Sequence, residues 1–180
     1  MRWCSPIWVG SQPTMAQMQL VLLRHAKSSW TDPALADHAR PLNARGRRAA
    51  ALVGRHLHAM QWQPDLVLCS SATRTRQTLE LLGIADAVDV EIEDSLYGAE
   101  AGELLARIQR VPAAVKVLLL IGHNPGLEDV TSVLIGGDAA LAGKFPTGAM
   151  ADVRLPIRRW EEVAPGIGRL EAFVAPRDLS

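Results

Sequence analysis

Short apolar runs separated by polar segments dominate the hydrophobic pattern of the chain. Three runs are nearly uninterrupted, at residues 20–23, 65–69 and 115–121. Runs of this length with β-branched residues suit parallel strands that are covered on both faces, although a short run alone does not exclude a buried helix. Polar residues follow each run directly. We therefore predict three buried strands, each with its carboxyl end among polar side chains.

Most of the remaining chain shows either apolar residues at helical spacing or an alternation of apolar and polar residues. Apolar residues recur at helical spacing from Asn43 to Met60 and in three later segments, and alternation or apolar content predicts further strands at residues 88–92, 149–155 and 168–174. The later helices are expected through Gln77–Leu82, Leu104–Ile108 and Leu127–Leu134. Asn124 is expected to cap the last of these, with Pro125 at its first position.

Strand and helix alternate along most of the chain. This order predicts an α/β fold, a three-layer sandwich with a mostly parallel central sheet and helices on both faces. The last two strands follow each other without a helix, so an antiparallel edge is expected there. Residues 18–180 are predicted to form a single domain, and residues 1–17, which contain Pro6 and Gly10, a disordered extension.

The predicted strand ends carry the candidate chemistry. Arg24 and His25 follow the first run, Arg74 lies near the start of the helix after the second, and His123 follows the third. In open α/β sheets, ligands bind beyond the carboxyl ends of the strands. Two guanidiniums, two imidazoles and helix N-termini would together form an anion site suited to phosphate. Each pair by itself is also compatible with an ordinary strand end.

The order of these motifs resembles the histidine phosphatase superfamily, and within it the phosphohistidine phosphatases of the SixA type. The resemblance runs from about Met18 to the C-terminus. It rests on Arg24-His25-Ala26-Lys27-Ser28, Arg40-Pro41-Leu42, Ser70 with Arg74 four residues on, Gly122-His123-Asn124-Pro125 and Phe145-Pro146-Thr147-Gly148. It implies a phosphoglycerate-mutase-like fold and a phosphatase that needs neither metal nor cofactor.

A mechanism follows as a hypothesis. His25 would attack the phosphoryl group and carry it as phosphohistidine until water hydrolyses it. Arg24 and Arg74 would hold the phosphoryl oxygens, and His123 would add a hydrogen bond to the developing charge. Further candidates for phosphate or substrate binding are Lys27, Arg40, Ser70 and Asn124, of which Arg40 is chosen by the resemblance alone. Asp94 is either a general acid or an exposed carboxylate.

The expected substrate is a phosphohistidine carried by a protein. Members of the resembled superfamily that cleave phosphoesters commonly have a glutamate where this chain has Asp94. The shorter aspartate would penalise phosphoesters, because their alkoxide leaving groups gain most from a strong general acid. Phosphohistidine needs less help, because its ring departs as neutral imidazole. The alternatives are a phosphatase or mutase acting on small phosphoesters and, in another class, a phosphate-recognising module without turnover.

Composition limits the possible partners. The chain has 180 residues with 19 basic and 19 acidic side chains, and this balance favours neither nucleic acid nor membrane as a partner. A monomer is expected. The two cysteines, Cys4 and Cys69, match no disulfide framework or metal site, which predicts a cytoplasmic protein. Cys69 also lies one residue too close to Arg74 for a cysteine phosphatase. His38 and His58 are predicted to be surface residues.

Overall fold

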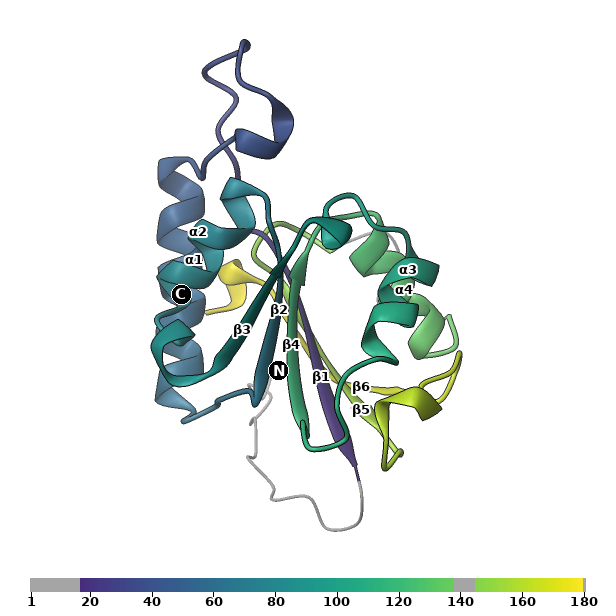
Figure 1. The fold of residues 1–180 in the computed structure, drawn as a ribbon. Coiled ribbons are helices and arrows are strands. Elements are labelled where there is room, and N and C mark those ends of the chain that lie inside the picture. The colour runs from purple at the N-terminus through teal and green to yellow at the C-terminus, as the bar shows by residue number, and fades with distance from the viewer. Residues whose placement is uncertain (1–16, 138–144, 180) are drawn as a thin grey trace, which may run out of the picture.

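The computed structural model describes residues 17–137 and 145–179. The extension predicted at residues 1–17 therefore lies outside the described residues except for Gln17. The described chain forms a six-stranded sheet with helices packed against both faces (Figure 1). None of the helices in these two ranges is long and apolar enough to cross a membrane.

The central sheet is mostly parallel, as the sequence predicts. Its strand order is β3-β2-β4-β1-β5-β6. The four strands from β3 to β1 run parallel, whereas β5 is antiparallel to both of its neighbours and forms the expected antiparallel edge with β6. The strands are β1 (Met18–Arg24), β2 (Leu66–Ser70), β3 (Asp89–Glu93), β4 (Val117–Gly122), β5 (Met150–Leu155) and β6 (Arg169–Val174).

Helices cover both faces of the sheet (Figure 1). The strands alternate their side chains between the two layers. On β1, Leu20 and Leu22 pack in the core under α3 (Ala101–Ile108) and α4 (Gly126–Leu134). The intervening Val21 and Leu23 pack under α1 (Ala44–Ala59) and α2 (Thr73–Leu82). Because both faces are buried, β1 is apolar at every position from 20 to 23. Short 3-10 helices lie at Asp37–Ala39, Ala85–Ala87, Asp94–Leu96, Trp160–Glu162 and Pro176–Asp178.

The helix starts agree with the sequence at α1 and differ at α4. Asn43 caps α1, since its Oδ1 accepts a hydrogen bond from the Gly46 amide at 2.8 Å. Asn124 was expected to cap α4, and this prediction is wrong. The helix begins at Gly126, so that Pro125, which has no side-chain acceptor, occupies the capping position one residue after Asn124. The side-chain NH2 group of Asn124 donates to Glu128 Oε2 at 2.7 Å.

Gly46 allows α1 to lie directly against the chain that leaves β1. A Cβ at this position would lie 2.1 Å from the carbonyl oxygen of Lys27, so no larger residue fits without a shift of the backbone. The same carbonyl accepts a hydrogen bond from the main-chain N–H of Asn43 at 3.0 Å. The first turn of α1 and the segment after β1 are thus fixed to each other.

Asp152 on β5 is a buried carboxylate with an incomplete set of partners. Its Oδ2 accepts a hydrogen bond from Gln19 Nε2 at 3.0 Å, whereas its buried Oδ1 has no partner among the described residues. Burial raises the pKa of Asp152 to about 6, with Arg154 opposing the shift. The ionised form is thus the less favourable one in the folded protein.

Asp152→Asn should stabilise the protein at pH 8 and have little effect at pH 4. The folded pKa lies above the unfolded value, so Asp152 ionisation costs stability as the pH rises from about 4 to 6 and the full cost remains above pH 6. The expected gain at pH 8 is on the order of 1–3 kcal/mol, measured by urea unfolding. Asp89→Asn, at an exposed position of β3, is the control. A gain of equal size at both pH values would contradict the assignment.

Candidate active site at the carboxyl ends of three strands

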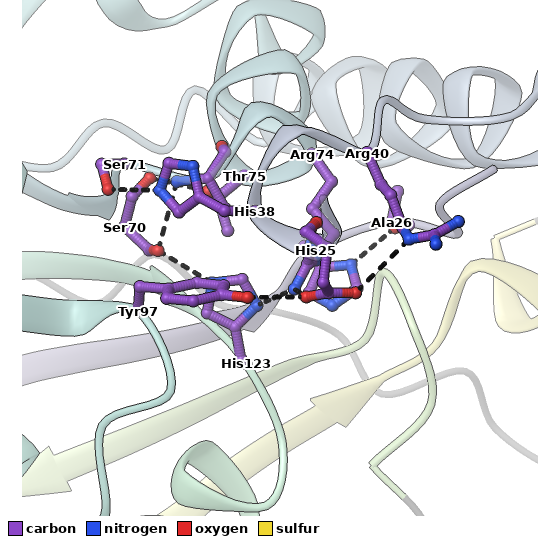
Figure 2. A network of polar contacts seen from close by, with 12 residues as sticks. His25, Ala26, His38, Arg40, Ser70, Ser71, Arg74, Thr75, Tyr97 and His123 are labelled. Atoms are coloured by element: carbon purple, nitrogen blue, oxygen red, sulfur yellow. Dashed lines mark hydrogen bonds and ion pairs between the residues drawn. The ribbon is translucent and has the colours of Figure 1, made fainter. Parts of the chain in front are cut away.

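The carboxyl ends of β1, β4 and β2 lie side by side and bring the predicted residues together. In the sheet register, Arg24 on β1 is level with Gly122 on β4, and Cys69 on β2 is level with Ile121 on β4. His123 therefore lies between the ends of the two flanking strands. The ring centroids of His25 and His123 are 5.0 Å apart, and Figure 2 shows Arg74 and Ser70 beside them.

The backbone fixes the tautomer of His25. Its Nδ1 lies 2.7 Å from the carbonyl oxygen of Ala26. A carbonyl only accepts, so Nδ1 carries the proton and Nε2 keeps its lone pair. Burial lowers the pKa of His25 to about 4, and this effect prevails over the opposing hydrogen bond to Ala26. The positive charges of Arg74 and Arg24 lower it further. At neutral pH this imidazole is therefore an uncharged base.

The Ala26 peptide is itself held by Thr78 on α2. The Thr78 hydroxyl accepts a hydrogen bond from the Ala26 amide at 3.1 Å and donates one to the Arg74 carbonyl at 2.7 Å. Thr78 was not among the residues predicted from the sequence. The available indication was a polar residue one helical turn after Arg74, at a position that α2 buries.

His123 uses both ring nitrogens within the protein. Nε2 lies 2.8 Å from the Ser70 hydroxyl, and Nδ1 lies 3.3 Å from Nη2 of Arg74. Arginine only donates, so Nδ1 is the acceptor and Nε2–H donates to Ser70. Burial, followed by His25 and Arg74, lowers the pKa of His123 to about 3. His123 is thus a second neutral imidazole at the site.

Asp37, from the loop between β1 and α1, contacts Arg74 directly. Arg74 Nη1 donates to the Asp37 carbonyl at 2.6 Å and Nη2 to the Asp37 carboxylate at 2.9 Å. The Tyr97 hydroxyl donates to the same carboxylate oxygen at 2.8 Å. These bonds, that of Tyr97 first, keep the pKa of Asp37 below its usual value, and the carboxylate raises the pKa of Tyr97.

His38 also lies beside the site, although we expected it on the surface. Its Nε2 is 2.8 Å from the Ser71 hydroxyl, and its ring packs edge-on against Tyr97 (Figure 2). His58 is exposed, as expected. No periodic pattern marks Asp37, His38 or Tyr97 in the sequence, because the first two lie in a three-residue 3-10 helix in the loop after β1 and Tyr97 directly follows another.

Two further candidates lie close to the cluster, Arg24 half-buried and Arg40 buried. Arg24 Nη1 donates to the Phe145 carbonyl at 2.6 Å, and its buried Nε has no partner among the described residues. Arg40 is also buried, stacks 4.1 Å from the ring centroid of Trp30 and lies 3.8 Å from Asp37 Oδ1. Arg40, which was chosen by the family resemblance alone, is thus a third cation near the site.

The other candidates have different surroundings. Asn124 donates to Glu128 and, at 3.3 Å, to the Phe145 carbonyl, and its buried Oδ1 has no partner in the described part of the chain. Lys27 and Asp94 are exposed, and within residues 17–137 and 145–179 neither side chain makes a hydrogen bond or ion pair. The acid that contacts the cluster is Asp37.

A cleft of about 390 Å³ adjoins His123. It lies at the N-termini of α3 and α4, between the turn after Tyr97 and the segment that follows β4. Its lining residues are Gly98, Ala99, Glu100, Ala101, Gly102, His123, Asn124, Pro125, Gly126 and Asp129. The cleft gives the buried imidazole cluster space on its solvent side for part of a bound molecule.

Cys69 is a core residue. It is fully buried, and burial raises the pKa of its thiol to about 12. A thiol with this pKa is not a nucleophile at neutral pH, which agrees with its assignment as a small apolar residue.

The fold and the sequence together identify the family. The sheet order and its flanking helices define a phosphoglycerate-mutase-like α/β protein. Residues 20–116 match the histidine phosphatase superfamily (branch 1), and the chain belongs to this superfamily. Membership implies a phosphatase that uses a histidine nucleophile. An uncharacterised protein of Mycobacterium tuberculosis is 44% identical over 162 residues, which cover 86% of this chain and all of the relative.

Solved structures place the chain among the SixA-type proteins. A protein from Nakamurella multipartitia assigned as the phosphohistidine phosphatase SixA has a TM-score of 0.78 and 32% identity, with 89% of this chain and 96% of that chain covered. The corresponding Agrobacterium tumefaciens protein has a TM-score of 0.77 and 32% identity, with 88% and 98% covered. The protein histidine phosphatase SixA complexed with tungstate is 27% identical, with a TM-score of 0.75 and 91% and 100% covered.

Both clustered histidines should remain neutral at pH 5, where an ordinary imidazole is mostly charged. The depressed pKa values of about 4 for His25 and about 3 for His123 require this. Ring ¹⁵N chemical shifts should show protonated Nδ1 in His25 and protonated Nε2 in His123, with His25 charging only as the pH falls through about 4. A titration of either ring near pH 6.5 would contradict the burial argument.

Proposed function

We propose that this protein is a phosphohistidine phosphatase that transfers the phosphoryl group to His25 and then to water. The observation that carries the proposal is the free lone pair on His25 Nε2, which exists because Ala26 holds the proton on Nδ1. A neutral imidazole needs no additional base to become a nucleophile. Its depressed pKa keeps it in this form throughout the neutral range.

Arg74 and Arg24 supply positive charge for the phosphoryl oxygens. Arg74 lies in the first turn of α2, where the helix N-terminus also favours an anion. The buried Nε of Arg24 has no partner among the described residues, so it is available as a donor. Phosphoryl transfer depends mainly on positioning and charge stabilisation, and fixed guanidiniums provide both without a metal ion.

Ser70 allows His123 to change its role when phosphate binds. A hydroxyl both donates and accepts, so Ser70 is compatible with either tautomer of His123. In the free site Arg74 donates to His123 Nδ1. In the proposed complex Arg74 turns its donor to the phosphoryl group, the proton of His123 moves to Nδ1, and Nδ1–H donates to a phosphoryl oxygen. Ser70 then donates to Nε2.

The similarity to the SixA-type structures supports phosphohistidine as the substrate. Transfer from a substrate phosphohistidine to His25 exchanges one phosphorus–nitrogen bond for another of the same kind, so this step is close to balanced in energy. Hydrolysis of the enzyme intermediate then makes the cycle irreversible. The cleft beside His123 and the half-exposed side chain of Asp37 beside Arg74 support access to the site by a histidine on another protein.

The wild-type protein should carry a covalent phosphate during turnover, and His25→Ala should not. The reaction with a ³²P-phosphohistidine protein is stopped in alkaline detergent, in which phosphohistidine survives, and the label should be lost on brief acid treatment. His58→Ala, at an exposed position on α1, should label like the wild type. Full labelling of His25→Ala would disprove the assignment of the nucleophile.

His123→Ala should lower kcat for phosphate release by about 10²–10³, which is the scale of removing one hydrogen-bond donor from a developing oxyanion. Ser70→Ala should lower kcat less, because Nδ1–H of His123 remains available to the phosphoryl oxygen without the Ser70 hydroxyl. Steady-state phosphate release measures both variants. Full activity of His123→Ala would mean that the tautomer exchange plays no part in turnover.

A further inference from the structure

Asp37 presents one carboxylate oxygen to the protein and leaves the other available. Oδ2 accepts hydrogen bonds from Arg74 at 2.9 Å and from Tyr97 at 2.8 Å. Oδ1 lies 3.8 Å from Arg40 Nε, which is too far for a hydrogen bond. Within the described residues Oδ1 therefore has no donor. Since Oδ2 and the main-chain carbonyl are both bound to Arg74, the position of Oδ1 is well defined.

Asp37 lies at the mouth of the site and the imidazoles at its base. His25 and His123 are 8% exposed, whereas the Asp37 side chain is 48% exposed. An attacked phosphorus must lie against His25 Nε2, and in-line displacement directs the leaving group away from that nitrogen. The leaving group of a protein-borne substrate therefore points outward, toward the level of Asp37.

The charge of Asp37 decides what it can offer a leaving group. The bonds from Tyr97 and Arg74 lower its pKa, so the carboxylate is ionised at neutral pH. An ionised carboxylate accepts hydrogen bonds and donates none. It is therefore a poor acid for an alkoxide and a good acceptor for an N–H group.

We propose that Asp37 selects a nitrogen leaving group, with Oδ1 accepting a hydrogen bond from the N–H of the ring nitrogen opposite the phosphoryl group. The inference rests on the proposed function and extends it to the residue that recognises the leaving imidazole. The ligand class is an N-phosphoryl imidazole protonated on its second ring nitrogen. Arg74 connects the phosphoryl-binding residues with Asp37, because it contacts both His123 and Asp37.

In this arrangement the transfer step exchanges one phosphorus–nitrogen bond for another. The lone pair of His25 Nε2 forms a bond to phosphorus, and the phosphorus–nitrogen bond of the substrate breaks with its electron pair going to the leaving nitrogen. The substrate ring starts as a cation and departs as neutral imidazole with its second N–H intact. Asp37 stabilises that cation and takes no proton.

The same carboxylate disfavours phosphoesters. A bound phosphate monoester brings only negative charge and an oxygen that needs a proton, and Asp37 provides neither a cation nor a donor. Arg40, Arg74 and Tyr97 face Asp37 and offset its charge in the free protein. Selectivity thus comes from a group that favours one leaving atom and opposes the other.

The test compares two substrates with wild type and Asp37→Asn. Phosphoimidazole supplies the N–H, and an aryl phosphate lacks it. Asp37→Asn should lower kcat/KM for phosphoimidazole by about tenfold to a hundredfold, the scale of one charge-assisted hydrogen bond. For the aryl phosphate, kcat/KM should stay the same or rise by up to about threefold, because the variant removes an opposing negative charge. Asp32→Asn is the matched control on the same loop, because within the described ranges the Asp32 carboxylate accepts a hydrogen bond from the Ala34 amide and from no residue of the site.

The possible outcomes separate this inference from the proposed function. An equal fall on both substrates would show that Asp37 only positions Arg74, and unchanged rates on both would show that it does not contact the leaving group. Either result overturns the inference and leaves a phosphohistidine phosphatase. Wild type that prefers the aryl phosphate would overturn both proposals.

A spectroscopic measurement checks that Asp37 occupies this place in solution. Tyr97 is the single tyrosine of the chain, so ultraviolet absorbance follows its ionisation alone. The bond to Asp37 raises the pKa of Tyr97, and Asp37→Asn should bring it down toward its ordinary value. An unchanged tyrosine titration would place Asp37 elsewhere and overturn the inference.

Discussion

The site depends on the hydrogen bond between His25 Nδ1 and the Ala26 carbonyl. This bond fixes both the orientation of the ring and the nitrogen that remains nucleophilic. It needs a rigid peptide, and Thr78 provides this rigidity by binding the Ala26 amide. Main-chain bonds from the Gly148 amide to the Arg24 and His25 carbonyls hold the same segment from the β5 side. A buried imidazole thus receives its tautomer from the backbone.

The strands and the residues at their ends could be predicted from the sequence with useful accuracy. Buried parallel strands are apolar throughout, and the polar residues that follow them mark a ligand-binding edge. This pattern was sufficient to bring Arg24, His25, Arg74 and His123 together. The antiparallel edge was also predictable, because β5 and β6 follow each other without an intervening helix.

The second layer of the site could not be predicted in this way. Asp37 and His38 come from a loop whose position is set by Arg74 and Ser71, and such long-range polar contacts leave no local pattern. Asp94 was predicted as a possible general acid from its sequence position, whereas the acid that contacts Arg74 in the structure is Asp37. Asn124 shows the related limit for helix caps. The helix begins one residue later than the sequence indicated, with Pro125 before it, and the Asn124 side chain donates to Glu128, which only the folded helix brings near.

The position of β4 in the sheet has a consequence for how the protein folds. This strand pairs with β1 and β2. Its last residue, Gly122, pairs with Arg24, which is almost a hundred residues earlier in the sequence. Pairing over such separations closes a long loop of chain and is slow compared with local helix formation. His123 therefore meets His25 only once the centre of the sheet is complete, so helices and hairpins that form early contain no part of a working site.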